Sequence, residues 1–565
     1  MSNCIVSPSL HFICRVPGSS AGRTTPRAVY LVPTVIRPYS SRYRHYSPRN
    51  PKRPTKSASS LTLGVAACFL VAGSVFFNSN ARYLGEAEVL VDRPNTAGLT
   101  LDNIMVGSVL PGRPGNLTPD QEAKLQELWT ATLTVFGVLA PNKPEDADGL
   151  QSTSGAATSE PKATKKKQSM FRRQDDSKTA ADQDDKYGQS KAFQQVLATQ
   201  NPENLRKAFW SMVKHDHPDG LLLRFLRARK WDVHNALVML IATMNWRMQE
   251  VHVDDDIMKK GEAQAMQDTS NSNATIKKEG HDFLAQLKLG KSFLHGTDKE
   301  GRPMCFVRVR LHRQGEQSET SLERYTVYTI ETARLLLASH VDTAAIVFDM
   351  TGFSMANMDY APVKFMIKCF EANYPESLGV VLVHKSPWIF HSIWNIIKGW
   401  LDPVVAKKVH FTKNIEELEQ FIEKSHIIKE LGGDDPWEYS YVEPKADENQ
   451  TMSDETTTNQ LLEERAKVVK EYESTTQAWI SDAQDRKTLQ QKRNDLAERL
   501  RAGYWQLDPY VRARSLYDRT GMIRGSEGGV IQYYGKPETP KGPKPLIASP
   551  QHGLVATEPR ADDVD

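Results

Sequence analysis

Apolar residues recur at intervals of three and four in two stretches of the first half of the chain, and this spacing predicts helices. In residues 118–136, Thr118 can cap a helix and Pro119 suits its first turn. One face of that helix is apolar and carries Leu125, Leu128, Trp129, Leu133 and Phe136. The same spacing returns over residues 203–250. We predict a small all-α lobe over 118–255, interrupted at 141–190 by a polar, low-complexity insert that we expect to be disordered.

Between residues 281 and 440 the pattern changes to short apolar, β-branched runs that alternate with helical stretches. The runs MCFVRVRLH, TAAIVFDMTG, GVVLVHK and KKVHF are each long enough for one strand. Helical periodicity occupies residues 321–339, 360–373 and 388–401. This alternation predicts an α/β lobe in which helices cover a mostly parallel or mixed sheet.

A long charged helix is predicted over residues 458–502, within a helical extension at 455–525. Its apolar stripe misses too many heptad positions for a coiled coil, so we expect it to pack on the body of the protein. The stripe consists of Val468, Tyr472, Trp479, Leu489, Leu496 and Leu500. Residues 526–565 are rich in Gly, Pro and Lys and indicate a disordered tail.

The amino-terminal region has the composition of a targeting segment. Residues 1–60 are rich in Arg, Ser, Pro and Tyr and contain no acidic residue, as in a mitochondrial transit segment. An uncharged apolar run follows at 61–78, and at about 1.5 Å per residue it is just long enough for one membrane span. We therefore expect a basic leader, a single transmembrane anchor, a linker at 79–117 and a membrane-anchored, mitochondrial protein. If the start codon is set too early, the alternative is a cytosolic protein or one peripheral to endomembranes.

Charge and cysteine content exclude several classes of function. Residues 1–85 hold eleven Lys or Arg and no acid, which leaves 61 basic against 69 acidic residues in the rest of the chain. A mildly acidic body lacks the basic stripe that binds phosphates of nucleic acid, so we expect no nucleic-acid partner. The five cysteines have neither CxxC spacing nor histidines at ligand intervals, so neither a disulfide scaffold nor a zinc site is expected.

Two enzyme motifs are nearly complete, but each fails at one position. LAQLKLGKS ends like a phosphate-binding loop at Gly290, Lys291 and Ser292, but Ala285 replaces its first glycine and the preceding stretch looks helical. GFSMA after a strand is similar to a nucleophile elbow at Ser354, but its last glycine is Ala356. The acid and base of a hydrolase would be Asp359 with His384 or His410.

Residues 387–403, PWIFHSIWNIIKGWLDP, form the most unusual segment. Read as a helix, it carries its polar residues His391, Asn395 and Lys398 on one narrow stripe. A helix that is otherwise apolar all round is either buried or faces hydrocarbon. It is too short to span a bilayer, so the alternatives are a core helix and a helix that lines a lipid cavity or meets a membrane.

Charged residues near this segment suit a lipid headgroup. Arg224, Arg227 and Lys230 lie close together on one helix, a pattern typical of a solvated face. Glu376 and the pair Lys407 and Lys408 lie beside predicted strands. A carboxylate that accepts sugar hydroxyls and cations that bind phosphate would together suit an inositol phospholipid.

Four motifs in this order resemble the CRAL-TRIO domain family, in particular its branch of yeast-type phosphatidylinositol transfer proteins. They are LLLRFLRARKWDVHNA, TDKEGRP at 297–303, YPESLG at 374–379, and LDPVVAKKV at 401–409 with LGG at 431–433. The resemblance implies a helical lobe, an α/β lobe with a lipid-binding pocket at 281–440, and a gate helix that closes the pocket. The helix at 387–401 matches the gate, with Trp388, Phe390, Ile393, Trp394, Ile397, Trp400 and Leu401 as its gate and pocket residues.

The resemblance also implies which residues bind the inositol headgroup. They are Arg229, Asp298, Glu376 and Lys408, matched through the ARK, DKxGRP, YPE and DPV motifs. One position departs from the family pattern, because Val405 follows DPV where a Thr is usual. A second lipid shares the pocket in this family: phosphatidylcholine, a sterol, squalene or a tocopherol-like molecule.

These patterns predict a non-enzymatic protein that binds and transfers phosphatidylinositol and a second lipid at a membrane surface, without a cofactor or metal. One alternative is a membrane-anchored lipid sensor or adaptor that recruits a protein partner through the helix at 458–502. The other is a serine hydrolase that uses Ser354.

Overall fold

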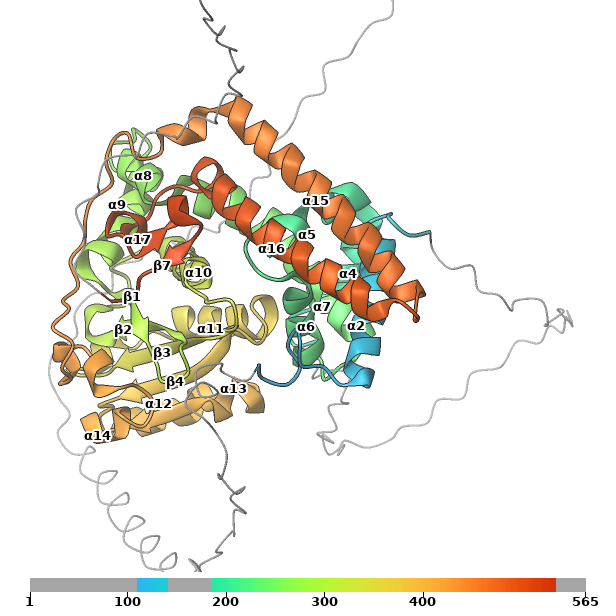
Figure 1. Cartoon of the computed structure of the whole chain (residues 1–565). Helices are drawn as coiled ribbons and strands as arrows, with labels where there is room; N and C mark the ends of the chain where they lie inside the picture. The colour runs from blue at the N-terminus through green and yellow to red at the C-terminus, as the bar shows by residue number, and fades with distance from the viewer. Residues whose placement is uncertain (1–108, 141–184, 535–565) are drawn as a thin grey trace, which may run out of the picture. The chain divides into compact units, whose positions relative to one another are not determined.

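The computed structural model describes residues 109–140 and 185–534, which all fall within one unit of the chain, Thr100–Asp565. An all-α lobe comes first and an α/β lobe follows it (Figure 1). The helices up to the first strand are α2 (Pro119–Val135), α4 (Gln189–Thr199), α5 (Pro202–Val213), α6 (Pro218–Ala228), α7 (Val233–Asn245), α8 (Lys259–Asp268) and α9 (Ala274–Leu289).

The predicted start of the first helix is confirmed at Thr118. Its hydroxyl accepts a hydrogen bond from the backbone N–H of Gln121, whose side chain accepts one from the N–H of Thr118. The insert predicted at 141–190 ends slightly earlier than expected, because α4 begins at Gln189. Its residues 141–184 lie outside the described part of the chain.

Five strands form one mixed sheet in the order β1-β2-β3-β4-β5. The strand β1 pairs antiparallel with β2, and the other neighbours are parallel. The elements of this lobe are β1 (Ser292–Thr297), β2 (Pro303–Arg308), α10 (Glu319–Leu335), β3 (Ala344–Asp349), α11 (Tyr360–Lys368), β4 (Leu378–His384), α12 (Phe390–Lys398), α13 (Pro403–Lys407), β5 (Val409–Thr412) and α14 (Ile415–Leu418). The predicted fold class is confirmed, and β1 is the strand that the sequence pattern missed.

The sheet is buried on both faces, which explains why its strands read as continuous apolar runs. Ala345, Val347, Val380 and Leu382 belong to a core cluster that includes Leu418 after β5. The alternate positions of the same strands point to the other face, where α10, α11 and α12 lie. Three successive crossovers between parallel strands place these helices on that one face.

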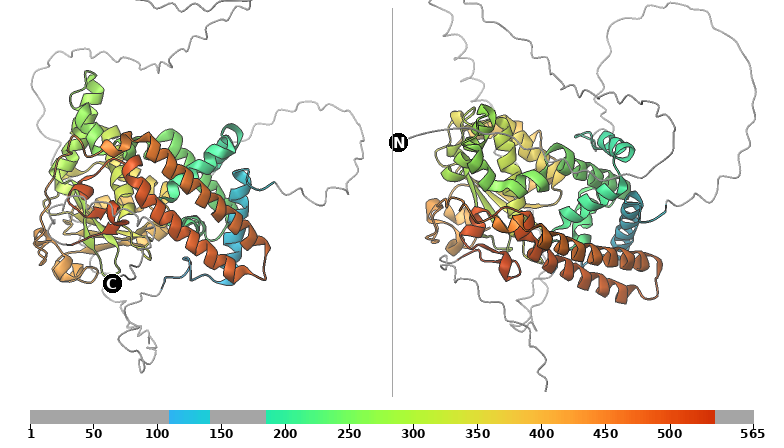
Figure 2. Two further views of the ribbon diagram at one scale, coloured as in Figure 1. Left: turned by 45° about the horizontal axis from the view of Figure 1, so that its top comes forward. Right: turned by 90° about the horizontal axis from the view of Figure 1, so that it is seen from above.

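The prediction of a single helix at 458–502 is wrong, because the structure has two helices there. They are α15 (Glu455–Ser481) and α16 (Arg486–Val511), which run side by side over the helical lobe (Figure 2). Tyr472 and Trp479 of α15 and Leu500 of α16 are buried in the same core cluster as α2 and α5, so the extension does pack on the body. After α17 (Leu516–Arg519), β6 (Ile523–Arg524) pairs with β7 (Val530–Ile531), and β7 lies inside the segment predicted as tail.

The prediction of a transmembrane, membrane-anchored protein is corrected. Across residues 109–140 and 185–534, no helix combines the length and the apolarity needed to cross a bilayer. The two longest helices, α15 and α16, are strongly charged, whereas the apolar α12 has only nine residues against the roughly 20 that a span requires. The leader and the run at 61–78, on which the anchor and the mitochondrial localisation were based, lie outside the described residues.

Candidate functional site

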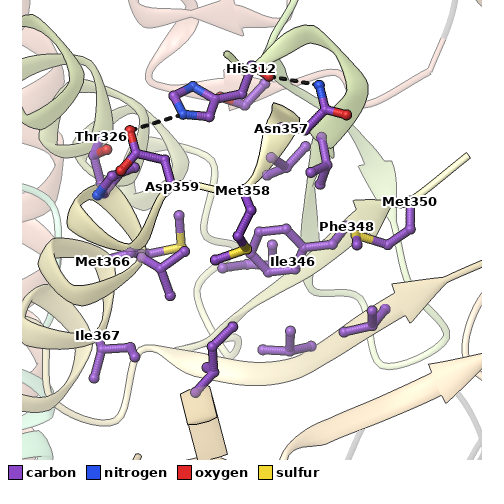
Figure 3. Close-up of a pocket in the computed structure, with 18 of the residues that line it drawn as sticks. His312, Thr326, Ile346, Phe348, Met350, Asn357, Met358, Asp359, Met366 and Ile367 are labelled. Atoms are coloured by element: carbon purple, nitrogen blue, oxygen red, sulfur yellow. Dashed lines mark hydrogen bonds and ion pairs between the residues drawn. The ribbon is translucent and has the colours of Figure 1, made fainter. Parts of the chain in front are cut away.

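A cavity lies between the sheet and the helices α10, α11 and α12. The cavity has a volume of about 250 Å³. Its floor consists of alternate residues of neighbouring strands, and its other walls come from the three helices. The floor residues are Val307, Ile346, Phe348, Val381 and Val383. Figure 3 shows this apolar wall together with Met366 and Ile367 of α11, and polar side chains of His312, Asn357 and Asp359 at one end.

The helix α12 closes one side of the cavity, in the position predicted for the gate. Of the seven predicted gate residues, four line the cavity: Phe390, Trp394, Ile397 and Leu401. Ile393 is buried beside them, and the ring of Trp400 lies 5.3 Å from that of Tyr360. Trp388 points away from the core and is 84% exposed. The segment is therefore two-sided: one face of α12 is turned toward the cavity, whereas Ile396 of α12 and Trp388, two residues before the helix, are exposed.

Two of the predicted headgroup residues lie together where the parallel strands begin. The ammonium group of Lys408, directly before β5, is 3.6 Å from the carboxylate of Glu376, which precedes β4. Both side chains are about a quarter exposed or less. Since the amino ends of parallel strands meet at one edge of a sheet, this pair marks what we call the amino edge. Val405 lines the cavity beside Leu378 and Val381, so this wall is apolar where relatives in the family pattern carry a hydroxyl.

The third predicted residue, Asp298, stabilises the turn between β1 and β2. Its carboxylate accepts hydrogen bonds from the backbone N–H groups of Glu300 and Arg302 at 3.0 and 2.9 Å, and burial raises its pKa. The side chain of Arg302 lies across Gly379, where a Cβ would come within 2.5 Å of the Arg302 Cδ. Asp298 is thus at the amino edge, but no contact of the described structure joins it to Glu376 or Lys408 directly.

The fourth predicted residue, Arg229, caps the end of α6 and donates a hydrogen bond to the side chain of Gln189 at 2.6 Å. Two neighbouring arginines lie at the amino edge. Arg224 donates to the backbone carbonyl of Glu376 at 3.1 Å, and Arg227 forms a 2.6 Å ion pair with Asp342, the residue two before β3.

The interpretation of Arg224 and Arg227 as a solvated face is wrong, since both are largely buried, whereas Lys230 is exposed. Burial would raise the pKa of Asp342, but Arg224 and Arg227 outweigh burial and lower it. The sequence does contain a signal that predicts the charged residues at the amino edge. A charged residue stands just before each of the parallel strands β3, β4 and β5, and such residues become neighbours at the amino edge.

The two enzyme motifs have structural roles. Gly290 ends α9 with a positive φ of 61°, so a helix precedes it where a phosphate-binding loop needs a strand. The hydroxyl of Ser354 donates to Asn357 at 2.9 Å, and no histidine of the described residues hydrogen-bonds to it. His384 instead contacts Thr412, and Asp359 caps α11. No group of His, Cys, Asp and Glu in the described segments is arranged to hold a metal ion.

Known proteins share both the sequence and the domain order of this chain. The family profile of the CRAL/TRIO domain matches residues 287–433, and that of the CRAL/TRIO N-terminal domain matches residues 189–242. A CRAL-TRIO domain-containing protein of Schizosaccharomyces pombe is 42% identical over 424 residues, which cover 73% of this chain and 92% of the relative. Phosphatidylinositol transfer protein CSR1 of Eremothecium gossypii is 39% identical over 446 residues, which cover 74% of this chain and 100% of the relative. Phosphatidylinositol/phosphatidylcholine transfer protein SFH12 of Arabidopsis thaliana is 26% identical over 39% of this chain and 40% of its own length.

Proposed function

Because the chain belongs to the CRAL-TRIO domain family, we propose that it is a non-enzymatic protein that binds one phospholipid in its cavity and exchanges it with membranes. The observation that carries this proposal is the cavity itself, whose walls are apolar over most of their extent. Such walls suit acyl chains, which are stabilised by about 0.8 kcal/mol for each CH₂ removed from water. A relative that is similar over its whole length is named as a phosphatidylinositol transfer protein.

For the headgroup we propose phosphatidylinositol, bound at the amino edge. Lys408 would bind the phosphate, and the carboxylate of Glu376 would accept hydrogen bonds from inositol hydroxyls. Arg229 and Asp298 would contribute to the same headgroup site, as the family motifs imply. Arg224 supports this arrangement by holding the backbone carbonyl of Glu376, which keeps its side chain beside Lys408.

For release and uptake we propose that α12 is the gate and opens at a membrane surface. A lipid with two long acyl chains loses many CH₂ contacts when it leaves, so unassisted exit into water is slow. The exposed Ile396 lies on the outer side of α12, whose inner side lines the cavity, and the exposed Trp388 lies two residues before this helix. An indole ring is favoured at the boundary between headgroups and acyl chains, so membrane contact through Trp388 would act directly on the gate.

We propose that a second lipid shares the cavity. A sensor or adaptor would use the same cavity but would exchange its lipid slowly and signal through a protein partner at α15. That helix is exposed along its outer side, for example at Leu462. No catalytic step is proposed, because no base among the described residues hydrogen-bonds to Ser354.

The test is a transfer assay with the full chain. Donor vesicles carry labelled phosphatidylinositol, acceptor vesicles carry none, and native mass spectrometry with lipid extraction measures what the protein holds. We expect one phospholipid per chain and transfer well above the spontaneous rate. A stably bound lipid without accelerated transfer would favour the sensor, and an empty protein after incubation with vesicles would contradict lipid binding.

A further inference from the structure

The cavity has a polar end formed by Lys291, which the function proposed above leaves unused. Lys291 follows the last turn of α9, is 5% exposed, and belongs to the residues that line the cavity. Its ammonium group lies 3.0 Å from Nδ1 of His312 and 2.5 Å from the side-chain oxygen of Gln317. The Nε2 atom of His312 is 3.3 Å from the carboxylate of Asp359 (Figure 3 shows this contact). We call these four residues the Lys291 cluster.

The Lys291 cluster lies at the opposite end of the strands from the amino edge. Lys291 directly precedes β1, whose first residue pairs with Val307 near the end of β2. Lys408 directly precedes β5, at the beginning of the parallel strands. With about 3.3 Å per residue, strands of six residues separate the two ends by roughly 20 Å. The same cavity is lined by Val405 near one end and by Lys291 at the other, so it extends along the strands.

The ammonium group of Lys291 would be satisfied by a hydrogen bond to an oxygen atom of the ligand. It has three N–H donors, and two of them have partners among the described residues. A methyl-ended chain that filled the cavity would leave the third donor against hydrocarbon, where an unpaired polar group is unfavourable. A neutral oxygen suits the site better than a carboxylate. The cluster already holds the negative charge of Asp359, and Glu316 and Asp282 lie near enough to influence Lys291.

Resting on the proposed lipid-binding function, we propose that the Lys291 cluster is a second recognition site, which takes a neutral hydroxyl oxygen carried at the end of a hydrocarbon chain. The source of this oxygen is either a free long-chain alcohol or a phospholipid whose acyl chain ends in a hydroxyl. In the second case the headgroup occupies the amino edge while the chain end reaches Lys291. The cavity would then select lipids by both of their ends.

The protonation state of the cluster agrees with this role. Burial lowers the pKa of Lys291 to about 8, while the carboxylates of Glu316, Asp359 and Asp282 act in the opposite direction. Burial also lowers the pKa of His312, and the charge of Lys291 lowers it further. At pH 7 Lys291 is therefore mostly protonated and His312 neutral, so the ammonium can donate to a ligand oxygen.

The experiment measures selection between ligands that differ in one oxygen. The full chain is incubated at pH 7 with phosphatidylcholine vesicles that contain equal amounts of 1-octadecanol, octadecane, stearic acid and a phosphatidylcholine whose acyl chain ends in a hydroxyl. Native mass spectrometry then reports the occupancy of each. We expect 1-octadecanol to exceed octadecane by about tenfold or more. Enrichment of the hydroxylated phospholipid instead would identify the phospholipid as the source of the oxygen and equally support the site.

The variant Lys291→Met removes the ammonium while keeping an unbranched side chain, and Lys288→Met removes an exposed lysine of the same helix as a matched control. We expect the preference for a hydroxyl to disappear in Lys291→Met and to persist in Lys288→Met, with phosphatidylinositol transfer retained in both. The ratio of alcohol to alkane does not depend on how stable the variant is. The proposal is overturned if wild type shows no preference, if stearic acid is preferred, or if Lys291→Met keeps the preference. Loss of all lipid binding by wild type would instead refute the proposed function.

Discussion

At the scale of single residues, the proposed headgroup site depends mainly on Lys408. Lys408 combines partial exposure with a carboxylate neighbour, so it can bind a phosphate without leaving a buried charge unpaired. The arginines around it are already engaged by protein groups: Arg224 by the Glu376 carbonyl and Arg227 by Asp342. Lys408 is therefore the residue whose loss should change lipid selection most.

We expect Lys408→Ala to reduce phosphatidylinositol transfer about tenfold or more, since a hydrogen bond to a charged group contributes about 1.5–3 kcal/mol. Transfer of a second lipid without an inositol phosphate should be retained. Vesicle transfer assays with each lipid measure both effects. The neighbouring Lys407→Ala, at an exposed position, is the matched control and should leave both rates unchanged. An equal loss of both lipids in Lys408→Ala would contradict the headgroup assignment.

A second residue-scale prediction concerns the pH dependence of folding stability. It rests on His215, which is buried against Trp505 of α16. Its Nε2 lies 3.0 Å from the carbonyl oxygen of Arg334, and its ring is 5.2 Å from that of Trp505. Burial lowers the pKa of His215 to about 4. The unfolded chain, with an ordinary histidine pKa of about 6.5, then binds the proton more strongly, so the folded state loses stability as the pH falls from about 6.5 toward 4.

The loss attributable to His215 is at most about 3 kcal/mol, from a difference of roughly 2.5 in pKa. Urea unfolding at pH 7.5 and pH 4.5 measures it. The variant His215→Gln, which does not titrate, should show a smaller decrease between the two pH values than wild type. His410→Gln changes an exposed histidine and should keep the wild-type decrease. The prediction is wrong if His215→Gln and wild type lose the same free energy.

At the scale of secondary-structure elements, local sequence patterns predicted most helices and strands but not their ends. The capping signal at Thr118 and the apolar runs at β2, β3, β4 and β5 are local features, and the structure follows them. The strand β1 was missed because its sequence SFLHGT contains no Val or Ile and so lacks the apolar, β-branched run by which the other strands were predicted; it pairs with β2. The reversal between α15 and α16 was missed because SDAQD contains neither Gly nor Pro.

Local sequence patterns also predicted only part of the candidate site. Motif matching selected Glu376 and Lys408, which the structure brings within 3.6 Å of each other. It could not select Asp342, whose partner Arg227 lies 115 positions away in the sequence. Nor could the residues of α12 be sorted by side from their apolar character alone. Ile396 and Ile397 are the same residue type, yet Ile396 is exposed and Ile397 lines the cavity.

This two-sided character of α12 leads to a prediction with an internal control. Ile397 and Ile396 are adjacent, but Ile397 is 8% exposed and lines the cavity while Ile396 is 48% exposed. We expect Ile397→Asp to abolish lipid binding, because it places a carboxylate against the acyl chains. Ile396→Asp should keep the bound lipid but slow its exchange with vesicles, because its new charge faces the membrane. Native mass spectrometry measures the first effect and the transfer assay the second. Equal behaviour of the two variants would contradict the gate.

At the scale of the whole described structure, the carboxyl-terminal elements complete both lobes. Tyr472 and Trp479 fill the core of the helical lobe, and the buried guanidinium of Arg493 forms an ion pair with Asp219 of α6. Tyr504, Trp505, Leu516 and Tyr517 belong to a second core cluster that extends to α9 and α10. The extension is therefore part of the fold.

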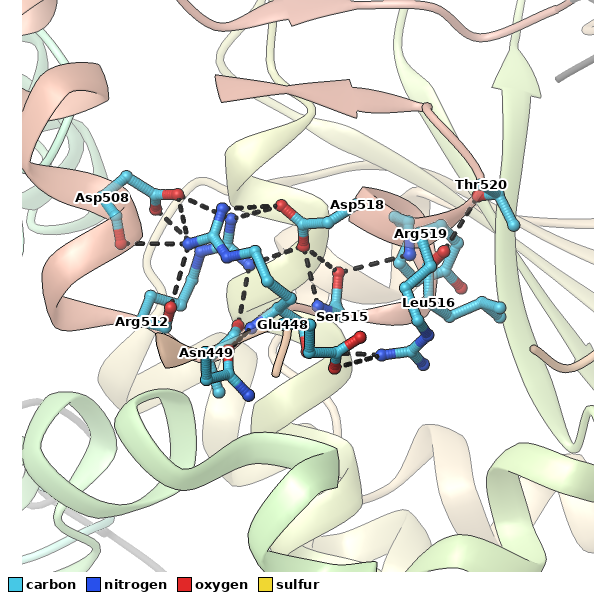
Figure 4. A network of polar contacts seen from close by, with 12 residues as sticks. Glu448, Asn449, Asp508, Arg512, Ser515, Leu516, Asp518, Arg519 and Thr520 are labelled. Atoms are coloured by element: carbon cyan, nitrogen blue, oxygen red, sulfur yellow. Dashed lines mark hydrogen bonds and ion pairs between the residues drawn. The ribbon is translucent and has the colours of Figure 1, made fainter. Parts of the chain in front are cut away.

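A polar network holds the end of this extension in place (Figure 4). Asp508 and Asp518 share the guanidinium groups of Arg512 and Arg514 at distances of 2.7–3.0 Å. These arginines lower the pKa of both carboxylates against the opposing effect of burial. From the next helix, Arg519 pairs with the buried Glu262 of α8 and with Glu448. Because the network joins α16, α17 and α8, removing the extension would leave Glu262 buried and without its cation.

We therefore expect a chain ended after residue 440 to yield no folded monomer, whereas a chain ended after residue 534 should melt cooperatively like the full chain. Truncation at 440 removes several buried core side chains, each worth about 2–5 kcal/mol, and the total exceeds the roughly 5–15 kcal/mol that stabilises a typical domain. It also leaves Asp219 without Arg493, and a buried charge that loses its partner costs about 3–5 kcal/mol. Circular dichroism melting and size-exclusion chromatography of the three chains test this. A soluble, cooperatively melting 1–440 chain that still binds phospholipid would show that the CRAL-TRIO lobes fold without the extension.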